Sequence, residues 1–121
     1  KHHLEYWIDY AVGDQKSGKV HGGMAGMKMP LKYVVEMFID RMSASKNYQK
    51  ENYTDRSPLE YFEHGKDHYL IHEDTEALLC YLLTMLAVRG EKETFAFVKN
   101  KVLKGKVPYE KKELDQRIKA L

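Results

Sequence analysis

The sequence predicts an all-α protein built as a bundle of about five helices. Two stretches, residues 30–45 and 74–89, repeat apolar side chains every three or four positions, which is the spacing of one buried helical face. A third stretch, at Ser57 to Glu60, has the arrangement of a helix start. No stretch shows the regular alternation of a half-buried strand. At 121 residues, the chain is expected to form one domain around one core.

Residues 1–12 are predicted to be the end of a helix, because three apolar residues in them have helical spacing: Leu4, Trp7 and Ile8. His2 and His3 lead into this helix. Adjacent histidines cannot share one helical face, so we expect only one of them to point where Trp7 points.

Residues 13–29 hold five of the eight glycines and are predicted to form a mobile connecting loop. Within this Gly-rich loop, residues 13–19 match the spacing G-x-x-x-x-G-K of a phosphate-binding loop. That function is excluded, because Val20 replaces the magnesium-binding Ser or Thr and no strand or helix is expected to flank the motif.

Residues 30–45 form the central predicted helix, with Pro30 suited to its first position. An unbroken apolar stripe runs along it: Leu31, Val34, Val35, Phe38 and Met42. Asp40 lies about 180° from this stripe, but it has Met37 and Ala44 beside it. We therefore expect its carboxylate to be at least partly buried. A buried carboxylate requires a charge partner, hydrogen bonds or a metal ion.

Other arrangements of Asp40 stay open. It could be exposed, or it could pair with Arg41, Lys46 or an arginine of another helix, and such a structural role is the more common one for a single aspartate. Glu36 lies one turn earlier, and two carboxylates at this spacing repel each other unless a cation lies between them. Lys32 can supply that cation, so the carboxylate pair does not by itself identify a site.

Residues 46–56 are polar and predict a loop, after which Leu59 and Phe62 face the core. Three histidines then recur at a spacing that suits metal ligands on a helix: His64, His68 and His72. Gly65 and the apolar residues 69–71 interrupt the helix between them. A coincidence at the surface is therefore favoured over a metal site.

The helix at residues 74–89 is the most apolar and is predicted to be core, with Gly90 ending it. A helix at residues 91–103 follows and is broken by Gly105 and Pro108. A last amphipathic helix carries three apolar residues: Leu114, Ile118 and Leu121.

Composition excludes several classes of function. A net charge of +2 is too small to indicate nucleic-acid binding, and the lysines at the C-terminal end have no interleaved aromatics, so a solvated surface is favoured there over a phosphate site. No apolar run approaches the length of about 20 residues that a membrane span needs. The single cysteine, Cys80, is expected to be a buried, reduced thiol, which indicates a cytoplasmic protein.

Four stretches together carry a resemblance to a known family: residues 1–7 (KHHLEYW), 29–41 (MPLKYVVEMFIDR), 44–48 (ASKNY) and 72–75 (HEDT). The chain resembles an uncharacterised bacterial family that looks like a relative of the HD-domain metal-dependent phosphohydrolases. The similarity covers roughly residues 1–100.

The resemblance implies an HD-like fold and a divalent metal ion held by histidines and aspartates on helices. It implies that Asp40 is the later aspartate ligand and that His2 or His3 is a further metal or phosphate ligand. Members of the family carry the first histidine and the His-Asp pair upstream, whereas this chain contains no His-Asp dipeptide. The chain is therefore expected to be the C-terminal part of a longer domain, with an incomplete site.

Two functions follow as expectations. The first is a metal-dependent phosphohydrolase, in which the ion activates water and polarises a phosphoryl oxygen and Lys46 or Tyr48 contacts the phosphate of a small molecule. The alternative is a non-catalytic helical module that binds a partner or itself. If upstream helices are missing, the apolar faces of residues 30–45 and 74–89 lack part of their cover, so we expect a homo-oligomer.

Overall fold

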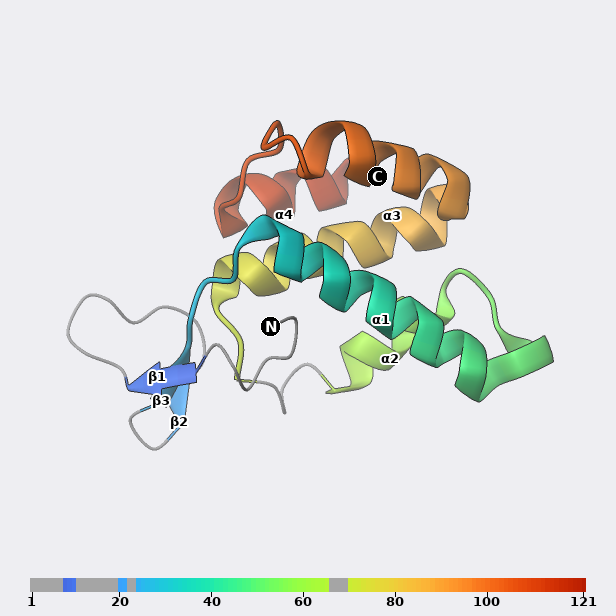
Figure 1. Ribbon diagram of the computed structural model, residues 1–121, viewed down its shortest axis with the longest axis horizontal. Coiled ribbons are helices and arrows are strands. Elements are labelled where there is room, and N and C mark those ends of the chain that lie inside the picture. Colours follow the sequence, from blue (N-terminus) through green and yellow to red (C-terminus); the bar gives the residue numbers. More distant parts are fainter. Residues whose placement is uncertain (1–7, 11–19, 22–23, 66–69) are drawn as a thin grey trace.

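The helical part of the molecule confirms the all-α class. A computed structural model describes residues 8–10, 20–21, 24–65 and 70–121 (Figure 1). The α-helices in the described part are α1 (Leu31–Gln49), α2 (Ser57–Gly65), α3 (Glu73–Phe97) and α4 (Lys111–Lys119). Two short helical elements extend them, a 3₁₀-helix η3 (Lys50–Asn52) and a π-helix η5 (Val98–Val102). No helix of this described part is long and apolar enough to cross a membrane.

The core lies between α1, α2 and α3, which pack against one another. The apolar stripe of α1 is buried at Val34, Val35, Phe38 and Met42. The five leucines predicted to form the stripe of α3 are fully buried: Leu78, Leu79, Leu82, Leu83 and Leu86. The expectation that these faces lack cover is therefore wrong, because the chain itself covers them. Cys80, expected to be buried, is only half-buried.

α3 consists of two helices joined at a break. Gly90 has φ +86° and ψ 172°, a backbone conformation that L side chains rarely adopt and that interrupts the helix. Figure 1 shows the ribbon turning back on itself beyond the gold part of α3 and continuing in orange. The predicted helix end at Gly90 is confirmed.

The C-terminal segment packs back on α3. Gly105 adopts φ +69°, and the chain then leads through Val107 and Pro108 to α4. α4 contacts α3 and buries Leu114 completely. The predicted break at Gly105 and Pro108 and the last amphipathic helix are confirmed.

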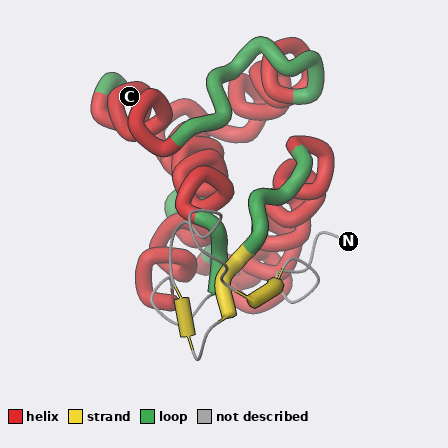
Figure 2. Tube along the Cα trace, turned by 90° about the vertical axis from the view of Figure 1, so that its left-hand side faces the viewer, coloured by secondary structure: helices red, strands yellow, loops and turns green. Residues whose placement is uncertain are grey.

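A small sheet lies at one end of the bundle, beyond the first turns of α1 and α3 (Figures 1 and 2). Its strands are β1 (Ile8–Tyr10), β2 (Val20–His21) and β3 (Met24–Gly26), in the order β1-β3-β2 with both pairs antiparallel. Ile8 pairs with Gly26, and His21 pairs with Met24. The prediction of a helix over residues 1–12 is wrong at residues 8–10, and residues 20–21 and 24–26 of the predicted loop are strands.

The sheet was missed because its strands are too short to show a period. One signal was present, since two glycines separate β2 from β3 and such a pair between short strands is typical of a hairpin. Gly26 also has a packing role. A Cβ atom there would lie 2.6 Å from backbone atoms of Ile71 and His72. Only glycine therefore allows β3 to approach the segment that leads into α3.

Candidate functional site

Asp40 is exposed on the outer face of α1, so the expectation that it is partly buried is wrong. Met37 and Phe38 are buried, and Met37 lies about 60° closer to the centre of the apolar stripe than Asp40 does. Packing therefore covers one flank of the stripe but does not reach the opposite face. Glu36 and Ala44 share that face and are exposed too. Asp40 has interactions of its own, as does Glu36.

The two histidines proposed as further ligands, His2 and His3, lie outside the described residues. Their distance to Asp40 therefore stays a prediction. The described residues contain no group of three or more His, Cys, Asp and Glu side chains that could hold a metal ion. The predicted mobility of the Gly-rich loop concerns mainly residues 13–19 and 22–23, which also lie outside the described part.

Lys46 and Tyr48, predicted to contact a phosphate, differ in their surroundings. The Nζ atom of Lys46 lies 2.5 Å from Oε1 of Glu91, and it also lies 5.5 Å from the centre of the Tyr53 ring. Lys46 thus ties the end of α1 to the residues that follow the break at Gly90. Burial, together with the carboxylates of Asp55 and Glu91, raises the pKa of Tyr53 to about 12. Tyr48, by contrast, is 86% exposed.

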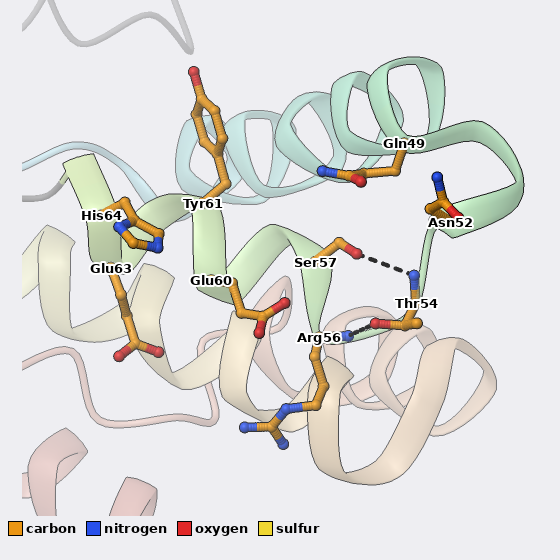
Figure 3. Close-up of a pocket in the computed structure, with 9 residues that line it drawn as sticks. All are labelled: Gln49, Asn52, Thr54, Arg56, Ser57, Glu60, Tyr61, Glu63 and His64. Atoms are coloured by element: carbon orange, nitrogen blue, oxygen red, sulfur yellow. Dashed lines mark hydrogen bonds between the residues drawn. The ribbon is translucent and has the colours of Figure 1, made fainter.

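An open polar pocket of about 770 Å³ lies between the end of α1 and α2 (Figure 3). Nine residues line this pocket, named below the α1–α2 pocket: Gln49, Asn52, Thr54, Arg56, Ser57, Glu60, Tyr61, Glu63 and His64. Figure 3 shows Tyr61 directed away from Arg56 and Glu63. The lining offers many hydrogen-bond donors and acceptors and two aromatic rings, those of Tyr61 and His64.

Two hydrogen bonds in the pocket shape the turn before α2. The backbone N–H of Thr54 donates to Oγ of Ser57 at 3.0 Å, and the N–H of Arg56 donates to Oγ1 of Thr54 at 3.3 Å. The predicted helix start at Ser57 is confirmed by the bounds of α2, and the Ser57 hydroxyl accepts its hydrogen bond from the preceding turn. Within the described residues, the pocket contains no nucleophile–base pair. Sequence reasoning missed the pocket, because its lining shows only as a polar stretch.

Of the histidines at four-residue spacing, the two described ones, His64 and His72, do not lie on one helix. His64 is exposed in the last turn of α2, which ends at Gly65, and His68 lies outside the described residues. His72 precedes α3 and accepts a hydrogen bond from the backbone N–H of Asp74 at its Nδ1 atom, over 3.1 Å. It therefore caps the N-terminus of α3. Burial lowers the pKa of His72, opposed by the carboxylates of Asp74 and Glu73.

The comparisons with known proteins bear on the whole N-terminal part. A model of a family of unknown function, DUF5662, matches residues 1–85, which is more than half of the chain. No curated protein and no solved structure matches. The family match thus includes α1, α2 and the first turns of α3, and leaves α4 outside it. This chain belongs to the family of unknown function DUF5662.

Proposed function

We propose that the protein is part of a divalent-metal-dependent phosphohydrolase of the HD type, with an HD-like fold, which acts on a nucleotide or another phosphate ester. Asp40 contributes one metal ligand. Two observations support this proposal. The four sequence stretches that carry the HD resemblance include Asp40, and α1 presents the Asp40 carboxylate on its exposed face.

The rigidity of α1 is the structural argument for Asp40. Val34 and Phe38 are completely buried, and Met42 is nearly so. A helix fixed by packing along one face holds the side chains of its other face in defined positions, as a ligand site requires. The exposed Asp40 can therefore meet donors from residues outside the core without any rearrangement of α1.

The described residues do not by themselves fit a complete metal site. Asp40 offers one carboxylate, and no group of three or more candidate ligands occurs in the described part of the chain. His2 and His3 remain proposed ligands, because their placement lies outside that part. In this proposal Asp40 therefore supplies one ligand, and the remaining ligands come from residues outside the described part.

The phosphate contacts in this proposal are unequal. Lys46 would have to leave Glu91, from which it lies 2.5 Å, before it could bind a phosphate. The exposed Tyr48, two residues further along α1, offers its hydroxyl group directly. We therefore place Tyr48 ahead of Lys46 as a phosphate contact.

The test compares Asp40→Asn with Glu93→Gln, which removes an exposed charge from the second helix of α3. Bound metal is measured by mass spectrometry after equilibration with Mn²⁺, and phosphate release is measured with p-nitrophenyl phosphate and nucleotides. Both measurements use the full-length protein encoded by the gene. Asp40→Asn should lose the bound metal and reduce hydrolysis on the order of a hundredfold or more, at an unchanged unfolding midpoint.

Glu93→Gln should behave like the wild type in both measurements. Wild-type protein without bound divalent metal and without phosphate release would contradict the proposal. So would an Asp40→Asn variant that keeps both properties.

A second candidate, a non-catalytic module that associates with itself or a partner, has a separate basis. The exposed large apolar side chains of the described residues include Ile39 (41%), Tyr48 (86%) and Tyr61 (64%). Aromatic residues are enriched at protein interfaces. Because the apolar faces of α1 and α3 are buried within the chain, they do not support association. The predicted homo-oligomer is therefore based on these exposed residues instead. Sedimentation of the wild type and of a Tyr48→Ser, Tyr61→Ser variant tests it: the double variant should shift a wild-type oligomer towards monomer.

A further inference from the structure

The residues that lead into α1 are held by a segment almost at the other end of the chain. Tyr109 lies 80 positions after Met29, yet its hydroxyl donates to the Met29 carbonyl oxygen over 2.5 Å. The backbone N–H of Met29 donates in turn to Oγ1 of Thr75 over 3.1 Å. Met29 and Thr75 are almost completely buried. Both backbone groups of Met29 are thus satisfied by side chains from two distant elements.

The direction of each hydrogen bond in this ring is determined. Tyr109 has one hydroxyl proton, and it lies on the bond to Met29. The bond of 2.8 Å between Oγ1 of Thr75 and the Tyr109 oxygen must therefore use the proton of Thr75. Each hydroxyl donates once and accepts once, so the ring leaves none of its groups unsatisfied. Burial raises the pKa of Tyr109 to about 12, which keeps this hydroxyl protonated near neutral pH.

Charged side chains next to this hydrogen-bonded ring, called the charged layer below, join the same three segments: the residues before α1, the start of α3 and the segment around Tyr109. The ammonium group of Lys28 donates to the backbone oxygen of Tyr109 at 2.7 Å and lies 4.4 Å from the centre of its ring. The same group lies 3.3 Å from Oδ2 of Asp74, at the start of α3. Lys28 therefore joins these segments through a charged group, as Met29, Thr75 and Tyr109 join them through neutral groups.

The N-terminus of α4 depends on this layer. Glu110, at its N-cap position, forms no side-chain capping bond. Instead, the backbone N–H of Lys111 donates to Oδ1 of Asp74 over 2.8 Å. A carboxylate of α3 thus supplies the acceptor that a helix N-terminus needs. The start of α4 and the residues before α1 are fastened to the same two residues of α3, Asp74 and Thr75.

We propose that residues 107–111 form a latch that couples the residues before α1 to the start of α4, so that the two segments open as one unit. The Met29 junction, defined as Lys28, Met29, Asp74, Thr75, Tyr109 and Lys111, is the fastening of this latch. Displacement of residues 107–111 would thereby release the start of α1. The latch does not depend on the proposed function. Its residues 107–111 lie outside residues 1–85, which the family model matches, so a segment beyond the family match holds the start of α1.

Hydrogen–deuterium exchange of the full chain tests the latch. Tyr109→Phe removes the hydroxyl but keeps the ring over which Lys28 lies, and Tyr48→Phe removes an exposed hydroxyl as the matched control. Tyr109→Phe should speed exchange about tenfold in peptides covering both residues 27–34 and residues 107–114, because each buried partner loses its hydrogen bond. Peptides covering residues 78–86 should exchange as in the wild type.

A milder variant provides a second test in case Tyr109→Phe fails to fold. Lys28→Gln removes the ion pair with Asp74 and should speed exchange in the same two segments by roughly threefold. Acceleration in only one of the two segments would overturn the coupling. Uniform acceleration that includes residues 78–86 would show a general loss of stability and would also overturn it, as would variants that exchange like Tyr48→Phe.

Discussion

The α1–α2 pocket and the Met29 junction are both rich in polar side chains, but they use them in opposite ways. The pocket collects its residues from positions 49–64, and most of them are exposed. The junction collects its residues from three segments, around Met29, Thr75 and Tyr109, and closes their hydrogen bonds on one another. The pocket is therefore open to ligand or solvent, whereas the groups of the junction are already occupied.

The difference teaches where polar residues contribute to stability. A buried donor or acceptor that loses its partner costs the full desolvation of that group, whereas an exposed one is satisfied by water. The same substitution should thus have a large effect at the junction and a small one in the pocket. Two pairs of variants test this comparison, and a third pair extends it to His72, which lies next to the junction.

The largest difference is expected between Thr75→Val and Thr54→Val. Valine in place of Thr75 keeps the shape but leaves the Met29 N–H buried without an acceptor, and should lower the free energy of unfolding by about 2 kcal/mol. Thr54 is exposed, and its bond to the Arg56 N–H can be replaced by water, so the change should stay within about 0.5 kcal/mol. Urea denaturation measures both. Equal losses would show that the comparison is wrong.

A smaller difference is expected between Asp74→Asn and Glu63→Gln. Asparagine in place of Asp74 loses the charge that faces Lys28 and weakens the cap of α4. The free energy of unfolding should fall by about 1 kcal/mol, and less so at high salt, because salt screens the ion pair. Glu63 is exposed in the pocket, and its change should be close to zero at either salt concentration. A loss for Asp74→Asn that is independent of salt would assign the effect to the helix cap alone.

The smallest expected effect is on the pH dependence of stability, and it compares variants of His72 and His64. Burial lowers the pKa of His72 below its ordinary value of 6.5. As the pH falls, the unfolded chain therefore takes up the proton first, so the contribution to stability is complete above pH 6.5 and is lost as the pH falls towards the folded-state pKa. His72→Asn keeps a capping acceptor that does not titrate. Its stability should decline less between pH 7 and pH 5 than that of the wild type.

His64→Asn, in the exposed last turn of α2, provides the control for this measurement. Its unfolding midpoints should follow the wild-type pH profile. A His72→Asn variant that also follows the wild-type profile would mean that the cap of α3 does not depend on the protonation of His72.

The sequence by itself determined most of the helical fold. The apolar stripes located α1 and α3, Pro30 and Ser57 marked helix starts, and Gly90 marked the break. These signals are local: hydrogen bonds three or four residues apart set the helical period, and single residues with special backbone preferences end it. The strands were missed because two or three residues are too few to show a period.

Only the tertiary structure decided which polar residues become hydrogen-bond or ion-pair partners of distant residues. It placed Asp40 on the exposed face, although the sequence pattern predicted partial burial, because packing covers just one flank of the α1 stripe. It paired Lys46 with Glu91 and made Thr75 and Tyr109 the partners of Met29. These contacts join residues that lie from 45 to 80 positions apart. No periodicity or spacing predicts such pairs, because they depend on how the helices pack rather than on how each helix forms.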